Sequence, residues 1–247
     1  MSGNMGVVIH WNLRGIKDKR NCNYKKIDIV SQTLFSTRNL AALNLQETHL
    51  ETDLGIPQEW LNFYNKFHVL TSNVSNDDRF GGIVIFINKN FEICGSETIV
   101  PGRVLLIKAK DIATSESINF LSIYGKASGT PLEKQTIFRT IFTRFSLSQY
   151  SEKCIALGDF NFAMSNFDRN SNITNQTDKM CKEDWDKLEL HLNLVDSFRY
   201  NNSTRRLYSY SSATNAKSRI DRIYITQSMT GQILNMQFEN LMSVITK

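Results

Sequence analysis

The chain has 247 residues, of which 41% are hydrophobic and 21% are charged, ordinary values for a globular protein with a sizeable core. Twelve Gly and three Pro exclude a Gly-rich or Pro-rich linker, and no internal repeat is visible. The net charge of +5 favours an anionic partner such as nucleic acid, although basicity specifies a partner only loosely.

Targeting and cysteine signals are weak. No stretch approaches the ~18 apolar residues that span a membrane, and the first residues lack an apolar signal core. The four cysteines have no paired spacing, so neither a zinc site nor a dense disulfide framework is indicated. We therefore expect a soluble, intracellular protein that is not secreted and has no membrane partner.

The predicted elements alternate irregularly, with strands in the majority. Apolar periodicity predicts strands at 7–13, 40–45, 82–88, 104–110, 118–124, 154–157, 207–211, 220–226 and 233–238. Helical spacing predicts helices at 24–36, 57–64, 131–147 and 178–192, with a polar loop at 14–23 and a turn at 76–79. Runs of strands interrupted by a few long helices indicate an α/β (α+β) fold of two packed sheets flanked by helices.

The most informative segment is the apolar run 154–157, which ends in Gly158, Asp159, Phe160 and Asn161. Alternation at period two predicts that Asp159 and Asn161 share one face of this strand. Buried strands that end in polar groups are how open sheets present catalytic residues. We therefore expect both side chains to reach one reacting group.

Four other predicted strands end in a polar residue: Asn12, Glu47, Tyr124 and Asp221. Each has an ordinary structural interpretation as a turn cap, a surface charge, a core aromatic or, for Asp221 between two arginines, an ion pair. Ionisable residues at strand ends are mostly structural, so the order of all five sites carries more weight than any one of them.

That order resembles the endonuclease/exonuclease/phosphatase superfamily, which includes deoxyribonuclease I and the apurinic endonucleases. The matching motifs are Trp11-Asn12-Leu13-Arg14-Gly15, Leu45-Gln46-Glu47-Thr48-His49, Ile123-Tyr124, Gly158-Asp159-Phe160-Asn161 and Ser218-Arg219-Ile220-Asp221. The resemblance implies a four-layer α/β-sandwich with two packed mixed sheets, formed by one domain over residues 6–247.

Secondary signatures are similar to the endonuclease domain of LINE-type non-LTR retrotransposons. They are Pro101-Gly102-Arg103-Val104, Asp168-Arg169, the segment Leu194 to Arg199, and Tyr208-Ser209-Tyr210-Ser211. This resemblance implies a DNA-nicking enzyme that frees a 3′-hydroxyl primer for a downstream reverse transcriptase of the same polyprotein. Such an enzyme would act in the nucleus on chromosomal DNA.

Phosphodiester cleavage needs charge neutralisation, an aligned water and help for the leaving oxygen. Mg²⁺ suits the first task, with Mn²⁺ as a possible substitute, and Glu47 is the expected carboxylate ligand with Asn12 beside it. Asp159 is expected to deprotonate the water and Asn161 to hold Asp159 or the phosphate. Tyr124 is expected to donate to a phosphate or leaving oxygen.

In the resembling family, the aspartate at the position of Asp221 fixes a histidine in a Ser-Asp-His motif on the following strand. This chain has no such motif, and 242–247 lie about where it is expected to begin, so we expect a C-terminally truncated domain. If Lys247 is instead the natural end, we expect activity to be reduced by roughly 10²–10⁴. Of the histidines, His49 has a modest functional expectation because it lies beside Glu47. The others, His10, His68 and His191, are interpreted as structural or surface residues.

Basic residues near these motifs are candidates for phosphate contact. They are Arg14, Lys17, Lys19 and Arg20 after the first strand, Lys126 after Tyr124, and Arg205 and Arg206 before 208–211. In resembling enzymes the last of these segments inserts toward a DNA groove. A solvated charge run is about as good an interpretation as DNA binding.

Two alternatives remain open. One keeps the fold and metal but changes the substrate to an abasic site, RNA or a phospholipid. The other is a catalytically crippled nucleic-acid-binding fragment. Intact Asn12, Glu47, Asp159, Asn161 and Asp221 argue against decay, whereas the missing histidine argues for it.

Overall fold

The computed structural model describes residues 6–16, 23–74, 80–147, 152–171, 175–232, 235–239 and 242–246. The strands are β1 (Val7–Asn12), β2 (Leu40–Gln46), β3 (Phe67–Ser72), β4 (Ile83–Asn88), β5 (Phe91–Val100), β6 (Val104–Asp111), β7 (Ser117–Tyr124), β8 (Lys153–Asp159), β9 (Leu194–Asp196), β10 (Tyr210–Ser211), β11 (Lys217–Ser218), β12 (Asp221–Thr226), β13 (Asn235–Glu239) and β14 (Met242–Thr246). The helices are α1 (Asn23–Ser36), α2 (Gln58–Leu61), α3 (Pro131–Ser146), α4 (Gln176–His191) and α5 (Ser197–Asn201).

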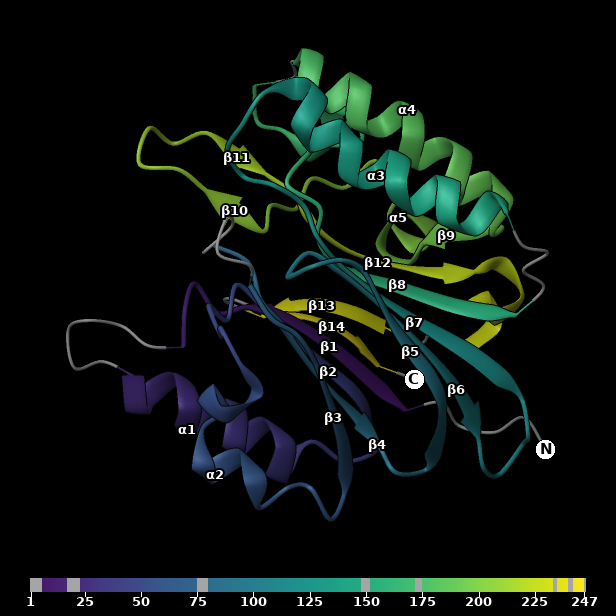
Figure 1. Cartoon of the computed structure of the whole chain (residues 1–247). Coiled ribbons are helices and arrows are strands. Elements are labelled where there is room, and N and C mark those ends of the chain that lie inside the picture. Colours follow the sequence, from purple (N-terminus) through teal and green to yellow (C-terminus); the bar gives the residue numbers. More distant parts are fainter. Residues whose placement is uncertain are drawn as a thin grey trace.

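Two six-stranded sheets form the centre of the molecule, and β10 pairs with β11 in a separate hairpin. The first sheet has the order β13-β14-β1-β2-β4-β3 and the second has the order β5-β6-β7-β8-β12-β9. Both are mixed, because β1–β2 and β7–β8 are parallel pairs among antiparallel neighbours. Figure 1 shows α1 and α2 outside the first sheet and α3 and α4 outside the second. The predicted four-layer sandwich is therefore confirmed.

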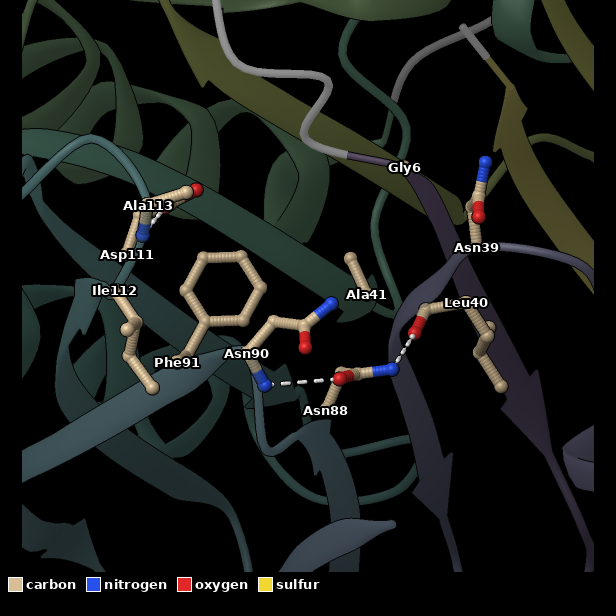
Figure 2. A pocket seen from close by; sticks show the side chains of 10 residues that line it. All are labelled: Gly6, Asn39, Leu40, Ala41, Asn88, Asn90, Phe91, Asp111, Ile112 and Ala113. Atoms are coloured by element: carbon tan, nitrogen blue, oxygen red, sulfur yellow. Dashed lines mark hydrogen bonds between the residues drawn. The ribbon is translucent and has the colours of Figure 1, made fainter.

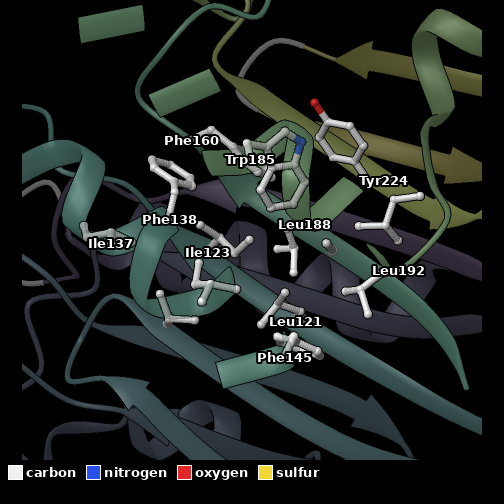
Figure 3. Close-up of a cluster of buried hydrophobic side chains, with 14 of the residues drawn as sticks. Leu121, Ile123, Ile137, Phe138, Phe145, Phe160, Trp185, Leu188, Leu192 and Tyr224 are labelled. Atoms are coloured by element: carbon white, nitrogen blue, oxygen red, sulfur yellow. The ribbon is translucent and has the colours of Figure 1, made fainter. Parts of the chain in front are cut away.

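Three apolar layers hold this sandwich together. The layer between the sheets includes Val8, Ala42, Phe120 and Leu157. A second layer packs α1 and α2 on the first sheet through residues such as Val30 and Trp60. The third packs α3 and α4 on the second sheet, where Phe138, Phe160, Trp185 and Tyr224 form a contiguous aromatic cluster (Figure 3). Burial of these large side chains is the main stabilising contribution.

The two long helices begin at strong local signals. Thr130 and Glu133 form a reciprocal capping box at the start of α3, with Pro131 in the first turn. Asn175 and Asp178 form the same motif at α4, so this helix begins two residues before the predicted 178. None of the described helices combines the length and the apolar character that a bilayer crossing requires.

Several predicted boundaries were wrong. Strands β5, β9, β11 and β14 were not predicted, and of 207–211 only Tyr210–Ser211 is a strand. β5 lies at a sheet edge and alternates exposed with partly buried positions, but Gly95 and Glu97 occupy partly buried positions and the register shifts near Gly95, which hides its apolar pattern. The predicted turn at 76–79 lies outside the described residues.

Polarity changes along the strands where the two sheets face each other. At one end of the interface the inward positions are apolar, and toward the other end they become polar. The polar inward residues are His10 and Asn12 on β1, Asn44 and Gln46 on β2, Ser122 and Tyr124 on β7, Asp159 on β8 and Asp221 on β12. The candidate site lies at this end of the sandwich.

Candidate active site

Asp159 is the centre of the site and is almost fully buried. Its Oδ2 accepts a hydrogen bond from Asn12 Nδ2 at 3.0 Å, and its Oδ1 accepts one from the backbone N–H of Asn161 at 2.9 Å. Its own backbone N–H donates to Gln46 Oε1 at 2.8 Å. The carboxylate is therefore oriented by donors from both sheets.

Asn161 reaches the site in a different way from the predicted one. Strand β8 ends at Asp159, and Asn161 follows it with φ of 53°, so the two residues do not share a strand face. The side-chain amide of Asn161 donates to Gly125 O at 2.7 Å, while its backbone N–H donates to Asp159. The turn itself, rather than period-two alternation, brings the two residues together.

Glu47 is connected to the Asp159 carboxylate by Asn12, whose side chain is hydrogen-bonded to both. Burial would raise the pKa of Glu47, but the neighbouring side chains of His49, Asn12 and Tyr124 outweigh it and hold the pKa below its usual value. His49 Nε2 lies 3.6 Å from Glu47 Oε1. Glu47 therefore remains ionised while its side chain is about one-fifth exposed, as a cation ligand requires.

Tyr124 is buried at the end of β7, and its hydroxyl is hydrogen-bonded to Glu47. Burial, together with the charges of Glu47 and Asp159, raises the pKa of Tyr124 well above its ordinary value. The guanidinium of Arg103 lies 4.5 Å from the centre of the Tyr124 ring. Tyr124 therefore keeps its proton and acts as a donor.

Asp221 faces Asp159 across the β8–β12 ladder, where the two are register partners. Its Oδ1 is bonded to His10 Nε2 at 2.9 Å. The neighbouring arginines point elsewhere, since Arg219 binds Asp168 and Asp196 and Arg222 donates to Phe162 O. The alternative that Asp221 belongs to an ordinary arginine ion pair is therefore wrong.

Three carboxylates close together create an unfavourable field. Burial raises the pKa of Asp159 well above its usual value, and the charges of Asp221 and Glu47 raise it further, against the lowering effect of Asn161 and Asn12. A carboxylate with a raised pKa is a stronger base than an ordinary aspartate. The arrangement suits proton abstraction, and a bound cation would relieve the repulsion.

Backbone geometry is unusual around the same residues. Arg14, Glu47, His49 and Asn161 all have φ between 52° and 56°, a conformation uncommon for residues with a Cβ. Such conformations cost about 1–3 kcal/mol each and concentrate at functional sites. Hydrogen bonds such as Gly15 N to Glu47 O at 2.6 Å fix these turns.

Gly158 allows the close approach of β8 to Gln46. A Cβ built on it would lie 1.9 Å from Ile123 O and 2.5 Å from Gln46 Nε2, at a φ of +147°. We expect Gly158→Ala to lower the free energy of unfolding by about 2–4 kcal/mol, measured by urea titration. Gly95→Ala is the matched control, because no atom lies within 4 Å of a Cβ there. Equal stabilities of the two variants would contradict the prediction.

The basic residues predicted to bind nucleic acid lie around the site, and their contacts do not show whether they bind phosphate. Arg14 is exposed, and its backbone N–H donates to Asn12 Oδ1 at 3.0 Å, so it lies at the site edge. Lys126 follows Gly125, whose carbonyl binds Asn161. Arg205 and Arg206 are exposed and precede Ser209, whose hydroxyl accepts the Asp221 N–H. Lys17, Lys19 and Arg20 lie outside the described residues.

The secondary signature residues form buried ion pairs beside the site. Arg219 bridges Asp168 and Asp196, with N–O distances of 2.7 Å to each. Arg199 also binds Asp168, and Arg169 forms a two-pronged pair with Asp178. These contacts join η2 (Asn166–Asp168), α5 and the residues that lead from β11 into β12.

Sequence reasoning missed four buried polar residues behind the site: His10, Asn44, Gln46 and Ser122. Gln46 holds the Asp159 backbone, Ser122 joins Gln46 to Asn44, and Asn44 contacts His10. The available signal was a polar residue two positions before the polar strand end on β1, β2 and β7.

The donor set is compatible with Mg²⁺. Within the described part of the chain, no three His, Cys, Asp or Glu side chains are grouped closely enough to hold a metal by themselves. Mg²⁺ is commonly bound by one or two carboxylates, with water and substrate phosphate completing the coordination. The ionised, partly exposed Glu47 fits this pattern, whereas Asn12 beside it turns its Nδ2 toward Asp159 and its Oδ1 accepts the Arg14 N–H.

A pocket of about 420 Å³ lies at the opposite end of the sandwich (Figure 2). Its lining includes Asn39, Asn88 and Asn90 and one carboxylate, Asp111, which is engaged by the N–H groups of Ala113 and Thr114. None of the predicted site residues lines it. It therefore offers no paired acid and base, and the candidate site remains the polar end of the sheets.

The fold and this constellation define a nuclease or phosphodiesterase of the four-layer sandwich class. Residues 9–232 match the model of the Endonuclease/Exonuclease/phosphatase family, so the chain belongs to that family. The family is generally dependent on divalent metals. No match was found among curated protein sequences.

Two solved structures have a similar fold. The Xenopus laevis APE2 catalytic domain has a TM-score of 0.71 and 17% identity, over 97% of this chain and 90% of that one. The AP endonuclease LMAP from Leishmania major has a TM-score of 0.73 and 15% identity, over 98% and 88%. At these identities the likeness concerns the fold.

Proposed function

We propose that this chain is a Mg²⁺-dependent phosphodiesterase that nicks duplex DNA and leaves a 3′-hydroxyl, as the endonuclease domain of a non-LTR retrotransposon. The observation that supports cleavage chemistry is the convergence of Asn12, Glu47, Tyr124, Asp159 and Asp221 at one end of the sandwich. The partners proposed from the sequence are DNA and a downstream reverse transcriptase. The proposed location is the nucleus, when the enzyme acts on chromosomal DNA.

Each residue has a role that follows from its contacts. Asp159 takes a proton from the attacking water, and Asn12 and the Asn161 N–H keep its carboxylate oriented. Tyr124 retains its proton and donates to a phosphate oxygen. Glu47, with Asn12 beside it, would hold Mg²⁺, which would neutralise charge on the phosphate.

A plasmid assay tests the proposal. Wild-type protein should convert supercoiled plasmid to the nicked circle with Mg²⁺ and lose this activity in EDTA. Glu47→Gln should lower the rate by about 10²–10³ and raise the Mg²⁺ concentration needed for half-maximal rate, because a neutral amide binds the cation more weakly. Glu59→Gln on α2, an exposed carboxylate in the outer layer, is the control and should leave both quantities unchanged.

The substrate is tested with matched oligonucleotide duplexes. An intact duplex and the same duplex with one abasic site should be cut at similar rates if nicking is the function. A rate much higher on the abasic duplex would replace DNA nicking by abasic-site cleavage. No metal-dependent cleavage of either duplex would refute the proposal as a DNA endonuclease.

A further inference from the structure

The two aspartates of the site are joined by a buried chain of hydrogen bonds that crosses between the sheets. The Asp159 backbone N–H donates to Gln46 Oε1 at 2.8 Å, and Gln46 Nε2 donates to Ser122 Oγ at 3.0 Å. The Ser122 hydroxyl donates to Asn44 Oδ1 at 2.8 Å. Asn44 Nδ2 then contacts His10 Nδ1 at 3.2 Å, and His10 Nε2 contacts Asp221 Oδ1 at 2.9 Å. We call Gln46, Ser122, Asn44 and His10 the interior chain.

The direction of every bond in the interior chain is fixed at its first member. A backbone N–H can only donate, so Gln46 presents its oxygen to Asp159 and its nitrogen to Ser122. Each following group then accepts on one side and donates on the other. His10 Nδ1 must accept from Asn44, which leaves the ring proton on Nε2, facing Asp221.

Burial makes this arrangement costly to disturb. Gln46, Ser122 and Asn44 have no exposed surface, and His10 is 1% exposed. Buried hydrogen bonds that run in one direction polarise one another, and an unmade bond there has no water to replace it. The last donor, His10, therefore presents a fixed N–H to the Asp221 carboxylate.

We propose that His10 is a positioning residue of the cleavage site: its Nε2–H, oriented by the interior chain, holds Asp221 in place opposite Asp159. This proposal rests on the proposed nuclease function. Asp221 is the register partner of Asp159, so a rotation of its carboxylate changes the charge that faces the proton acceptor. A further contact of Asp221, its backbone N–H to Ser209 Oγ, does not fix the carboxylate.

Variants of two histidines separate positioning from stability. His10→Leu should lower kcat by about 10- to 100-fold because the hydrogen bond from His10 to the Asp221 carboxylate is lost. KM should stay within about twofold, because His10 is buried and does not contact the substrate. His10→Gln, which keeps an N–H near Nε2, should recover most of kcat. His68→Leu is the matched control: His68 lies on edge strand β3 of the sheet that contains His10, its Nε2 contacts Phe91 O, and its replacement should leave kcat unchanged. Melting temperatures accompany all three variants.

Nitrogen NMR of the ring gives a readout that is independent of turnover. The wild-type protein should show His10 as the neutral Nε2–H tautomer, assigned by loss of the signal in His10→Gln. An Nδ1–H tautomer, or kcat for His10→Leu equal to that of His68→Leu, would overturn the proposal. A wild-type chain that fails to cleave DNA refutes the proposed function and the positioning role with it. A chain that cleaves while His10→Leu is unaffected refutes the role of His10 alone.

Discussion

Asp159→Asn should reduce plasmid nicking by about 10³–10⁴ and at the same time raise the melting temperature at pH 8. Activity falls because an amide cannot take the proton from water, and a positioned base contributes about this factor. Stability rises because burial and the charges of Asp221 and Glu47 raise the pKa of Asp159, so the folded protein holds an unfavourable carboxylate at this pH.

The sign of the stability change depends on pH. A carboxyl group whose pKa is higher in the folded state has no effect on stability below its unfolded-state pKa. As pH rises from there to the folded-state pKa, it destabilises the fold increasingly. The stabilisation by Asp159→Asn should therefore shrink as pH falls toward 4. Activity is measured as initial nicking rate, and stability by thermal unfolding at several pH values.

Asp53→Asn is the matched control for this experiment. It makes the same chemical change at an exposed carboxylate that accepts from Thr71 and Asn73, and hydrogen bonds lower its pKa rather than raise it. The control should keep the wild-type rate and gain no stability at pH 8. If Asp159→Asn kept more than a tenth of the wild-type rate, another group would be the proton acceptor.

The sequence alone identifies the candidate catalytic residues at the polar end of the sheets. Asn12, Glu47, Tyr124 and Asp159 stand out because each ends or follows an apolar strand, and Asp221 because it begins one; polar residues are rare within such runs. Their order carries the family resemblance that implies the sandwich and the convergence of these residues at one site. Their catalytic roles stay predictions, which the variants above test.

The buried polar residues behind the site cannot be identified from the sequence in the same way. His10 and Asp221 are separated by 211 positions, and their contact depends on how the two sheets pack. Asn44 and Ser122 are polar residues within largely apolar strands, and the sequence does not show whether either faces a helix or the other sheet. The packed structure is needed to show that these polar residues face the other sheet while their apolar neighbours face the helices.

Arg219 illustrates a signature residue whose observed contacts are structural. It is fully buried, its Nε binds Asp168, and its terminal nitrogens bind Asp196. Its guanidinium also lies 5.3 Å from the centre of the Phe198 ring. Because Arg219 is two residues before Asp221, the same ion pairs that stabilise the fold also fix the entry of β12 into the site.

Arg219→Met should lower the free energy of unfolding by about 3–5 kcal/mol at pH 7, the usual cost of leaving buried carboxylates without their cation. Burial alone would raise the pKa of Asp168, but Arg219, Arg222 and Arg199 lower it to about 2. The ion pair therefore contributes fully above the unfolded pKa near 3.8, and its contribution disappears as pH falls toward 2. The difference between wild type and variant should accordingly be smaller at pH 3 than at pH 7.

Urea titrations at both pH values measure this difference, with Lys182→Met as the control for loss of an ion pair. Lys182 pairs with Asp186 on the exposed face of α4, where such pairs contribute less than about 1 kcal/mol. A loss below 1 kcal/mol for Arg219→Met, or a loss that is equal at pH 3 and pH 7, would contradict the assignment of Arg219 as the cation of a buried network. A large, pH-dependent loss would instead mean that buried ion pairs hold the residues nearest Asp221 in place. Surface residues around the candidate site could then be substituted while β12 stays in register with β8.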